Sequence, residues 1–324
     1  MGSSGDGGET LHYQRVVDPR ADPDDARVAE GFFDLANAAV VRYSVGGDAP
    51  DAANADAANA DAAANDPTPR VELMVEQDQS LHDCCGGIVW ESAFCLAQYL
   101  RGEARARRIR GRRVLELGAG AGLLGLAAAA SGAKRVVLTD HPDAMPLLTR
   151  NVERNAEALA GAGDGDGDGD GDETGDGTGD AHASRRRRRI PKCLPLDWTD
   201  DAHLDAVADL GPFDVVLATD VVFNVDLVDP LLRCVRRCVK PRRGIAWVCL
   251  QERCPDAFAA FREKCRQGFD VREVPSDEVG FVDRECVLFE LRATGTGDGK
   301  DGGRGGGDGR KRKSEREARE RSKR

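Results

Sequence analysis

The sequence predicts a doubly wound α/β fold with a seven-stranded sheet, mostly parallel with an antiparallel last strand, and an N-terminal strand or hairpin extension. Strand-like apolar stretches alternate with helix-like stretches between residues 114 and 291. The stretch FDVVLATD at 213–220 is almost unbroken in its apolar character, which is typical of a strand buried on both faces of a parallel sheet. A glycine-rich turn directly follows the first strand of the series, where such sheets bind ligands.

The predicted elements follow one another in a regular order. Residues 114–117 form the first strand, 123–130 a helix and 134–140 the second strand. In the next helix, Met145, Leu148, Val152 and Leu159 recur at helical spacing and predict one apolar face. The remaining predicted elements are a short strand near 190–194, the strand at 213–220, a helix around 226–239, a strand at 244–250, a helix at 256–267, and two final strands near 269–274 and 286–291.

Several segments have compositions that do not support a packed core. Residues 48–66 contain a five-residue repeat of alanine, asparagine and aspartate, which would scatter the aspartates around a helix axis. Residues 161–189 combine alternating glycine and acidic residues with five consecutive arginines. We therefore predict a disordered N-terminus over 1–30, one domain over 31–292 with low-complexity insertions at 48–66 and 161–189, and a disordered basic tail over 293–324.

Composition disfavours several classes of protein. The net charge of −11 argues against a general nucleic-acid-binding protein, so nucleic acid is not an expected partner. No stretch approaches the ~20 apolar residues of a membrane span, so we expect no membrane association and a cytoplasmic location, with the basic tail as a candidate nuclear-localisation signal. The ten cysteines contain no CxxC pair, and no metal site is predicted.

The glycine-rich turn fits two cofactor patterns. From Gly120 to Gly125 it matches G-x-G-x-x-G of dinucleotide-binding folds, but the first glycine of that pattern should close the strand, and here the strand ends at Gly118. From Glu116, an acidic residue followed by Gly118-x-Gly120-x-Gly122 resembles motif I of class I S-adenosylmethionine (AdoMet)-dependent methyltransferases. A carboxylate would offset the positive charge of AdoMet but would repel a pyrophosphate, which favours AdoMet.

Asp140 ends the second predicted strand, 20 residues after Gly120. At this position a carboxylate can accept hydrogen bonds from both hydroxyls of a ribose. Dinucleotide enzymes make the same contact, so Asp140 supports a nucleoside without choosing between the two cofactors. The alternative is a residue that caps the helix expected after His141 and Pro142.

Three further stretches narrow the interpretation. They are GGIVWESAFCLAQYL at 86–100, LDW at 196–198 and ATDVVF at 218–223. With motif I, they resemble the seven-β-strand protein-lysine methyltransferases of the methyltransferase-like group, which modify chaperones, the valosin-containing AAA ATPase and translation elongation factors. The likeness runs from about residue 71 to residue 291, interrupted by the acidic insertion. It implies a Rossmann-like fold, AdoMet as the cofactor and a protein substrate of one of these classes, and we expect a monomer.

The resemblance also assigns roles to individual residues. It implies that Trp90 packs near AdoMet, that Trp198 lies against the adenine, and that Thr219 contacts the cofactor where the family often has alanine. Asp220 and Phe223 match the family's Asp-x-x-Tyr/Phe, which lies between the cofactor and the target lysine, and they form the predicted catalytic pair. The predicted cofactor-binding residues are Trp90, Glu116, Gly118, Ala119, Gly120, Asp140, Trp198 and Thr219.

Lysine methylation requires a neutral amine, because the unperturbed pKa of lysine is about 10.4 and only the neutral form can attack. Asp220 could orient the amine or accept its proton, and Phe223 could wall the channel. Phenylalanine in place of the commoner tyrosine removes any role for a phenolic hydroxyl. The alternatives are core packing for Trp90 and Trp198 and a capping role for Asp220.

Other functions remain open at this point. One is methyl transfer to a different nucleophile, such as a protein histidine or a small molecule. Another is a non-catalytic binding module with the same fold. Methylation of nucleic-acid amines is disfavoured because Asp220-Val221-Val222-Phe223 lacks the prolines of the adenine-methylating motif. An NAD-dependent oxidoreductase would need a separate acid/base pair for hydride transfer, and no such pair is visible.

Overall fold

The computed structural model describes residues 38–46, 70–84, 86–161, 190–279 and 286–294 of the 324-residue chain. The segments predicted as disordered or low in complexity lie outside these residues, except for Gly161, Ala293 and Thr294. Within the described ranges, the strands form one seven-stranded sheet and one two-stranded sheet. None of the helices in this part of the chain is long and apolar enough to cross a membrane.

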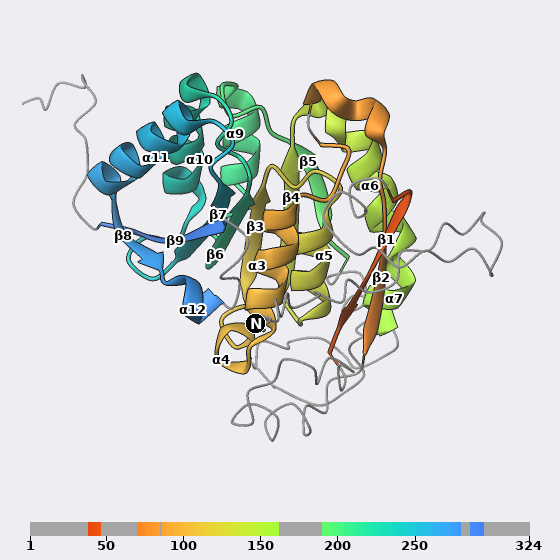
Figure 1. Ribbon diagram of the computed structural model, residues 1–324. Coiled ribbons are helices and arrows are strands. Elements are labelled where there is room, and N and C mark those ends of the chain that lie inside the picture. The colour runs from red at the N-terminus through yellow and green to blue at the C-terminus, as the bar shows by residue number, and fades with distance from the viewer. Residues whose placement is uncertain (1–37, 47–69, 85, 162–189, 280–285, 295–324) are drawn as a thin grey trace, which may run out of the picture. The chain divides into compact units, whose positions relative to one another are not determined.

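The seven-stranded sheet lies at the centre of the described fold (Figure 1). Its strands are β3 (Arg113–Leu117), β4 (Arg135–Asp140), β5 (Lys192–Pro195), β6 (Val215–Thr219), β7 (Ile245–Gln251), β8 (Phe269–Val274) and β9 (Cys286–Ala293). They are ordered β5-β4-β3-β6-β7-β9-β8, and β9 is antiparallel to both of its neighbours. This confirms the predicted mostly parallel sheet with an antiparallel last strand. The order reverses between β3 and β6, so ligands are expected beyond the carboxyl ends of these two strands.

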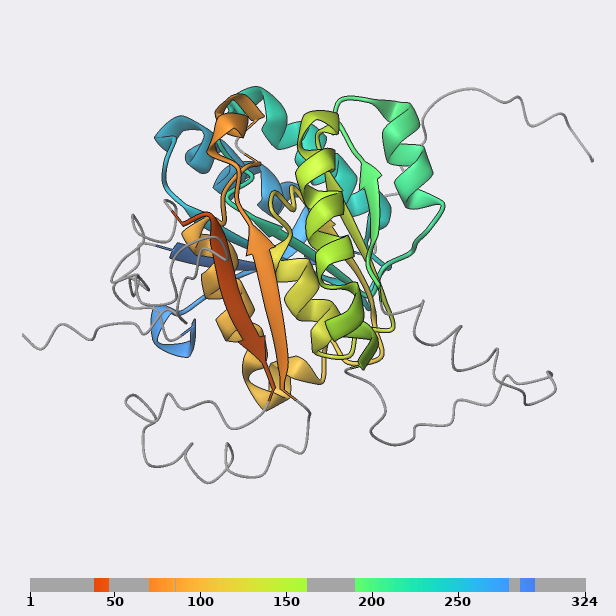
Figure 2. The same cartoon turned by 90° about the vertical axis from the view of Figure 1, so that its right-hand side faces the viewer.

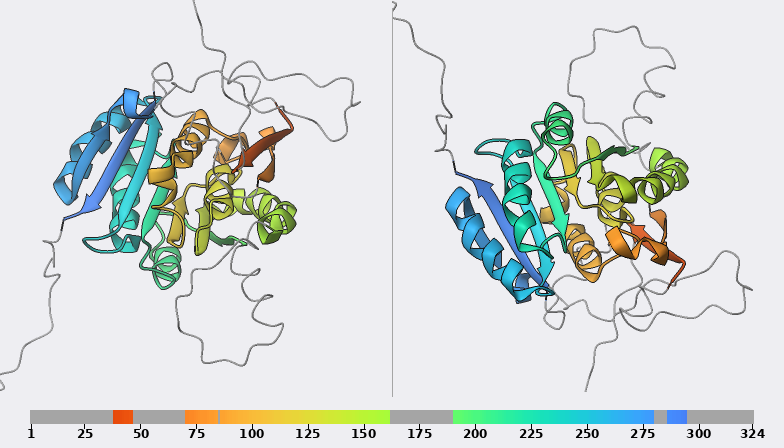
Figure 3. Two further views of the ribbon diagram at one scale, coloured as in Figure 1. Left: turned by 90° about the horizontal axis from the view of Figure 1, so that it is seen from below. Right: turned by 90° about the horizontal axis from the view of Figure 1, so that it is seen from above.

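Alternate residues of the central strands face two separate hydrophobic layers. Val114 and Leu217 face the first layer, whereas their neighbours Leu115 and Val216 face the second. Burial on both sides explains why these strands are apolar throughout. Figures 1 and 3 show the helices on opposite faces of the sheet. The first layer contains α3 (Glu91–Arg101), α5 (Leu123–Ala130) and α6 (Met145–Arg154), and the second contains α9 (Asp201–Ala208), α10 (Val228–Cys238) and α11 (Pro255–Gly268).

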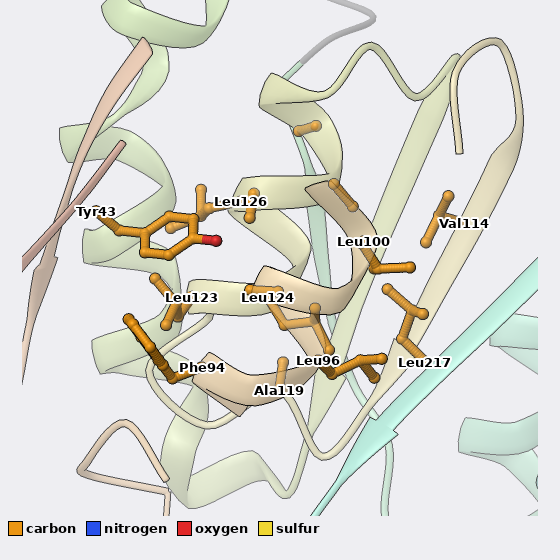
Figure 4. Packing of buried hydrophobic residues seen from close by; sticks show 14 of the residues in the cluster. Tyr43, Phe94, Leu96, Leu100, Val114, Ala119, Leu123, Leu124, Leu126 and Leu217 are labelled. Atoms are coloured by element: carbon orange, nitrogen blue, oxygen red, sulfur yellow. The ribbon is translucent and has the colours of Figure 1, made fainter. Parts of the chain in front are cut away.

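Figure 4 shows the packing of the first layer at close range. Leu96 and Leu100 of α3 lie near Leu124 of α5 and Leu217 of β6, and all four side chains are at most 4% exposed. Full burial of one such side chain contributes about 1.5–3 kcal/mol to stability. This layer fixes α3, the helix whose N-terminus carries Trp90, against the sheet.

The two-stranded sheet consists of β1 (Val40–Val45) and β2 (Val71–Glu76), which are antiparallel. It confirms the predicted N-terminal extension and lies beside α6 (Figure 2). The side-chain amide of Asn155 accepts from Met74 N and donates to Met74 O, both at 2.8 Å. Asn151 pairs with Glu76 in the same way at 2.8 and 2.9 Å, and it also donates to Ala121 O in the glycine-rich turn at 2.9 Å.

Geometry explains why two asparagines on a helix can pair with a strand. Four helical residues rise about 6 Å, and two strand residues rise about 6.8 Å, so the two amides match alternate residues of β2. Both asparagines are buried, at 0% and 2% exposure. They therefore satisfy the outer edge of β2 in place of a third strand.

Several local features differ from the prediction, and α3 is a helix that was not predicted. The helix expected to reach Leu159 is divided into α6 and α7 (Ala156–Gly161), and Asn155 lies between them. Helix α9 was not predicted, although Asp200 caps it by accepting from the N–H groups of Ala202 and His203. The helix expected around 226–239 begins with a 3₁₀ turn, η3 (Val225–Leu227), before α10.

Candidate functional site

The glycine-rich turn connects β3 to α5. Gly118, Gly120 and Gly122 have φ angles of 66°, 53° and 90°, a region that residues with a Cβ atom rarely adopt. Gly125 instead lies within α5, where an added Cβ would collide with Leu138. Gly120 and Gly122 belong to both patterns, and close packing of a helix at Gly125 also fits a dinucleotide pattern, so the left-handed conformation of Gly118 is what separates the two. This geometry favours the AdoMet interpretation over the dinucleotide pattern that begins at Gly120.

Gly118 lies close to Val221 and Trp198, where a side chain would not fit without movement. A Cβ atom added to Gly118 would lie 2.7 Å from Cγ1 of Val221 and 3.5 Å from Cζ2 of Trp198. Nε1 of Trp198 is buried, with no hydrogen-bond partner among the described residues. An aromatic ring with an unpaired N–H donor beside a glycine suits an adenine, which offers a π face and acceptor nitrogens. The residues present therefore fit the adenosine part of AdoMet.

Asp140 faces the same turn from the end of β4. Its Oδ2 accepts from Gly120 N and its Oδ1 from His141 N, each at 2.6 Å. Burial raises the pKa of this carboxyl, and the two N–H groups partly offset that rise. Each oxygen can still accept a further hydrogen bond, so the group retains capacity for two ribose hydroxyls. The following 3₁₀ turn is capped by the side chain of His141, so the capping alternative for Asp140 has no support.

Glu116 lies beneath the turn, facing α5. The residue is 1% exposed, and the backbone N–H of Gly125 donates to its carboxyl group. Oε2 has no partner among the described residues. Burial is the main cause that raises its pKa well above the usual value, and the charge of Asp140 adds to it. The direct compensation of the AdoMet charge by Glu116 stays a prediction.

Without cofactor, Glu116→Gln is expected to be more stable than the wild type at pH 8, by a margin that shrinks towards pH 5. The pKa of Glu116 is higher in the folded than in the unfolded chain, so its stabilising contribution is present at low pH and is lost as the pH rises through the folded pKa. Glutamine has no charge to bury, so it removes this loss. Urea unfolding at pH 5, 6, 7 and 8 measures the difference.

Calorimetry on the same variant tests the cofactor role of Glu116. An AdoMet affinity equal to that of the wild type would contradict charge compensation by this residue. A wild type that is more stable than the variant at pH 8 would contradict the cost of burying the charge.

Asp220 follows β6 in an unusual backbone conformation. Its φ of 49° is accessible to aspartate and asparagine but uncommon for other residues with a side chain. Oδ1 accepts from Gln251 N at 2.8 Å, and Oδ2 lies 3.3 and 3.2 Å from Nε and a terminal nitrogen of Arg253. Burial raises the pKa of Asp220, whereas Gln251 N–H, Arg253 and Ser92 lower it. These contacts hold the carboxylate in one orientation beside the turn.

Trp90 lies on the other side of Arg253. The guanidinium carbon of Arg253 is 4.5 Å from the centroid of the Trp90 ring. Trp90 is the N-cap residue of α3, so the position of that helix fixes where the ring can lie. The site therefore contains a cation between an aromatic ring and a carboxylate.

The segment 86–90 crosses the glycine-rich turn before it reaches Trp90. A Cβ atom added to Gly120 would lie 3.5 Å from the carbonyl oxygen of Gly86. The N–H of Val89 donates to Oε1 of Gln77 at 2.6 Å, which ties this segment to the residue after β2. The N-terminal extension thus positions Trp90 relative to the turn.

The remaining predicted site residues lie at the same end of the sheet. Ala119 donates its N–H to Thr139 O at 2.9 Å, and Thr219 is buried at the end of β6. Phe223 is 48% exposed, which is more than expected for a residue that walls a channel. Its role as a channel wall stays a prediction.

Arg253 and Gln251 were not predicted as site residues. They belong to the sequence Gln-Glu-Arg that follows the predicted strand at 244–250, and Asp220 and Asp140 were identified by the same kind of position. Their position after a strand was visible in the sequence, but their contact with Asp220 depends on the order of the strands in the sheet. No group of histidine, cysteine, aspartate and glutamate side chains in the described ranges could hold a metal ion.

Known proteins were compared with the whole chain. A family model described as "Lysine methyltransferase" matches residues 68–162 and 187–266, more than half of the chain. The chain is 26% identical over 194 residues to the protein-lysine methyltransferase METTL21E of Mus musculus, covering 60% of this chain and 67% of that protein. It is 30% identical over 209 residues to the protein N-terminal and lysine N-methyltransferase EFM7 of Yarrowia lipolytica, covering 64% and 68%.

A third relative is the protein N-lysine methyltransferase METTL21A of Danio rerio, 27% identical over 190 residues, with 59% of this chain and 71% of that protein covered. Other METTL21E relatives are covered over 57% to 60% of their own length. The segments matched by the family model contain Trp90, the glycine-rich turn, Asp140, Trp198 and Asp220. The chain therefore belongs to the lysine methyltransferase family, which confirms the predicted family, the enzyme class and AdoMet as the cofactor.

Proposed function

We propose that this chain transfers a methyl group from AdoMet to the ε-amine of a lysine in a substrate protein. The observation that carries the proposal is the Asp220 carboxylate, which already holds a cation beside the glycine-rich turn. Val221, the next residue, lies beside Gly118, so Asp220 is close to the residues that fit the adenosine part of AdoMet. A buried carboxylate at this position suits the binding of a lysine side chain.

Some residues of the site would bind the cofactor, and another would accept a proton. When bound, AdoMet supplies a methyl group that its sulfonium makes electrophilic. Trp198, Gly118 and Asp140 would hold the adenosine part. A neutral lysine amine would accept this methyl group, and Oδ2 of Asp220 would accept the proton that the nitrogen loses. Oδ1 keeps the N–H of Gln251, whereas Oδ2, which Arg253 binds in the free enzyme, can take this role once Arg253 moves away.

For the substrate, we propose a chaperone, an AAA ATPase or a translation factor, since the motifs resemble enzymes that act on these classes. We also propose that the enzyme acts as a monomer in the cytoplasm, with a nuclear fraction directed by the basic tail at 293–324. The name of the EFM7 relative includes protein N-terminal methylation. An α-amine is a similar nucleophile, so the experiment must distinguish the two products.

The proposed function is tested by incubating the protein with methyl-labelled AdoMet and cell lysate, followed by mass-spectrometric mapping of the labelled bands. Methyl groups on lysine side chains of discrete proteins are expected, and the label should disappear with Asp220→Ala. Methyl groups only on N-terminal amines, histidines, nucleic acid or small molecules would contradict the proposal. An unlabelled lysate together with intact AdoMet binding would instead support the non-catalytic binding module.

A further inference from the structure

Arg253 lies at a position suited to a substrate cation. Its guanidinium carbon is 4.5 Å from the centroid of Trp90, within the ~6 Å range of a cation–π interaction. Two of its nitrogens lie 3.2 and 3.3 Å from Oδ2 of Asp220. An aromatic face opposite a carboxylate is a combination that binds alkylammonium groups. We refer to Trp90 and Asp220 together as the cation cage, and the chain fills this cage with its own side chain.

The cation cage does not depend on Arg253 for its position. Oδ1 of Asp220 is held by the N–H of Gln251 at 2.8 Å, and the N–H of Asp220 donates to Cys249 O at 3.0 Å. Arg253 contacts the other oxygen, Oδ2, so its departure would free that oxygen while the carboxylate stays in place. The side chain of Arg253 is 35% exposed and that of Asp220 is 3% exposed. The guanidinium of Arg253 therefore lies at the solvent-exposed edge of the cage, where another cation can replace it.

Gln251 provides a second acceptor next to the cage. Its Oε1 accepts from a terminal nitrogen of Arg253, and its Nε2 donates to Oε2 of Glu91 at 2.7 Å. The bond to Glu91 keeps the amide in its present orientation when Arg253 moves. An incoming ammonium would therefore meet two placed acceptors, Oδ2 of Asp220 and Oε1 of Gln251, together with the ring of Trp90.

We infer that Arg253 is an internal substitute for the target lysine, which fills the cation cage in the free enzyme and is displaced when the lysine side chain enters. This inference rests on the proposed function, because it takes the cage as the subsite for the lysine ε-nitrogen. Occupancy by Arg253 lowers the observed affinity for a lysine side chain by a factor equal to the fraction of enzyme in which Arg253 has left the cation cage. A substrate protein therefore needs additional contacts outside the cage to offset the displacement of Arg253.

Butylammonium, which reproduces the end of a lysine side chain, is the probe for this inference. The wild type, Arg253→Ala and Arg253→Lys are titrated with butylammonium chloride at constant ionic strength, and binding is followed by the indole N–H resonance of Trp90, assigned with Trp90→Phe. Arg253→Ala is expected to bind the probe at least about tenfold more tightly than the wild type, a difference of about 1.4 kcal/mol. Arg253→Lys should resemble the wild type, because it keeps a cation in the cage.

Arg262→Ala is the matched control for loss of a positive charge. Arg262 is also ion-paired, with Glu273, and its side chain is 47% exposed, but it lies on α11 outside the network of the cage. This control should bind butylammonium as the wild type does. In Arg253→Ala combined with Trp90→Phe, probe binding is followed by calorimetry, and the tenfold gain should fall because phenylalanine is a weaker cation–π partner than tryptophan.

Equal or weaker butylammonium binding by Arg253→Ala than by the wild type would overturn the inference. AdoMet affinity, measured by calorimetry, should be unchanged and reports an intact site. If Arg253→Ala does not fold, Arg253→Gln also removes the charge and carries the same expectation. The titration involves no methyl transfer, so its failure is distinct from failure of the proposed function, which appears in the mapping of methylated residues in lysate.

Discussion

Asp220→Asn is expected to lower the rate of methyl transfer by about 10²–10⁴-fold, with AdoMet affinity close to that of the wild type. Asparagine tolerates the φ of 49°, and its amide oxygen can still accept the N–H of Gln251. The variant therefore keeps the local shape and loses the negative charge that binds a cation and accepts a proton. Initial rates on a mapped substrate protein, with calorimetry for AdoMet, measure the two effects separately.

The pH profile provides a second measurement of the same residue. Burial raises the pKa of Asp220 above the ordinary value of about 3.9, so the acid limb of wild-type activity should lie above that pH. The limb should be missing from the residual activity of Asp220→Asn. The control is Asp205→Asn on α9, because Asp205 is exposed and pairs with Arg237, and it should leave the rate unchanged. A wild-type rate in Asp220→Asn would contradict the proposed role of the carboxylate.

Gly118→Arg is expected to weaken AdoMet binding by more than about 100-fold, or about 2.7 kcal/mol, because its side chain would occupy the space beside Trp198. The φ of 66° adds a backbone cost of about 1–2 kcal/mol for any residue with a Cβ atom. Gly111→Arg is a close control, since Gly111 has a φ of 72° and an added Cβ there would meet open space. Gly118→Arg should lose more stability to urea than Gly111→Arg because its Cβ would also collide with Val221, and only Gly118→Arg should lose AdoMet.

Calorimetry with AdoMet and with NADH distinguishes the two patterns found in the glycine-rich turn. The wild type and Gly111→Arg should bind AdoMet and show no binding of NADH. Similar loss of AdoMet in both variants would mean that backbone strain alone disrupts the turn. NADH binding by the wild type would contradict the choice of cofactor.

Local patterns in the sequence were sufficient to predict the sheet. The apolar strands and the helical spacing of their neighbours depend on residues close together in the chain, and so does the turn that begins at Glu116. Trp247, in the middle of β7, is 1% exposed. The direction of Glu116 also follows from strand alternation, because it shares a face with Val114 and therefore points towards α5.

The contacts that could not be predicted from the sequence join residues that are far apart in the chain. Asn155, between α6 and α7, pairs with Met74, which is 81 positions away. Arg253 binds Asp220 across 33 positions, and the pairing exists only because β6 and β7 are neighbours in the sheet. No periodic pattern or short motif records contacts of this kind. The polar residues after each strand were visible, but which of them meet was not.

Asn151 links β2 of the small N-terminal sheet to the glycine-rich turn. Through Asn151, a single amide bonds both to β2 and to Ala121 of the glycine-rich turn, so order in one region favours order in the other. Linkage is reciprocal, and a ligand that stabilises the turn must stabilise the small N-terminal sheet by the same free energy of coupling. Slower hydrogen exchange at the amides of β1 and β2 is therefore an expected consequence of cofactor binding at the turn.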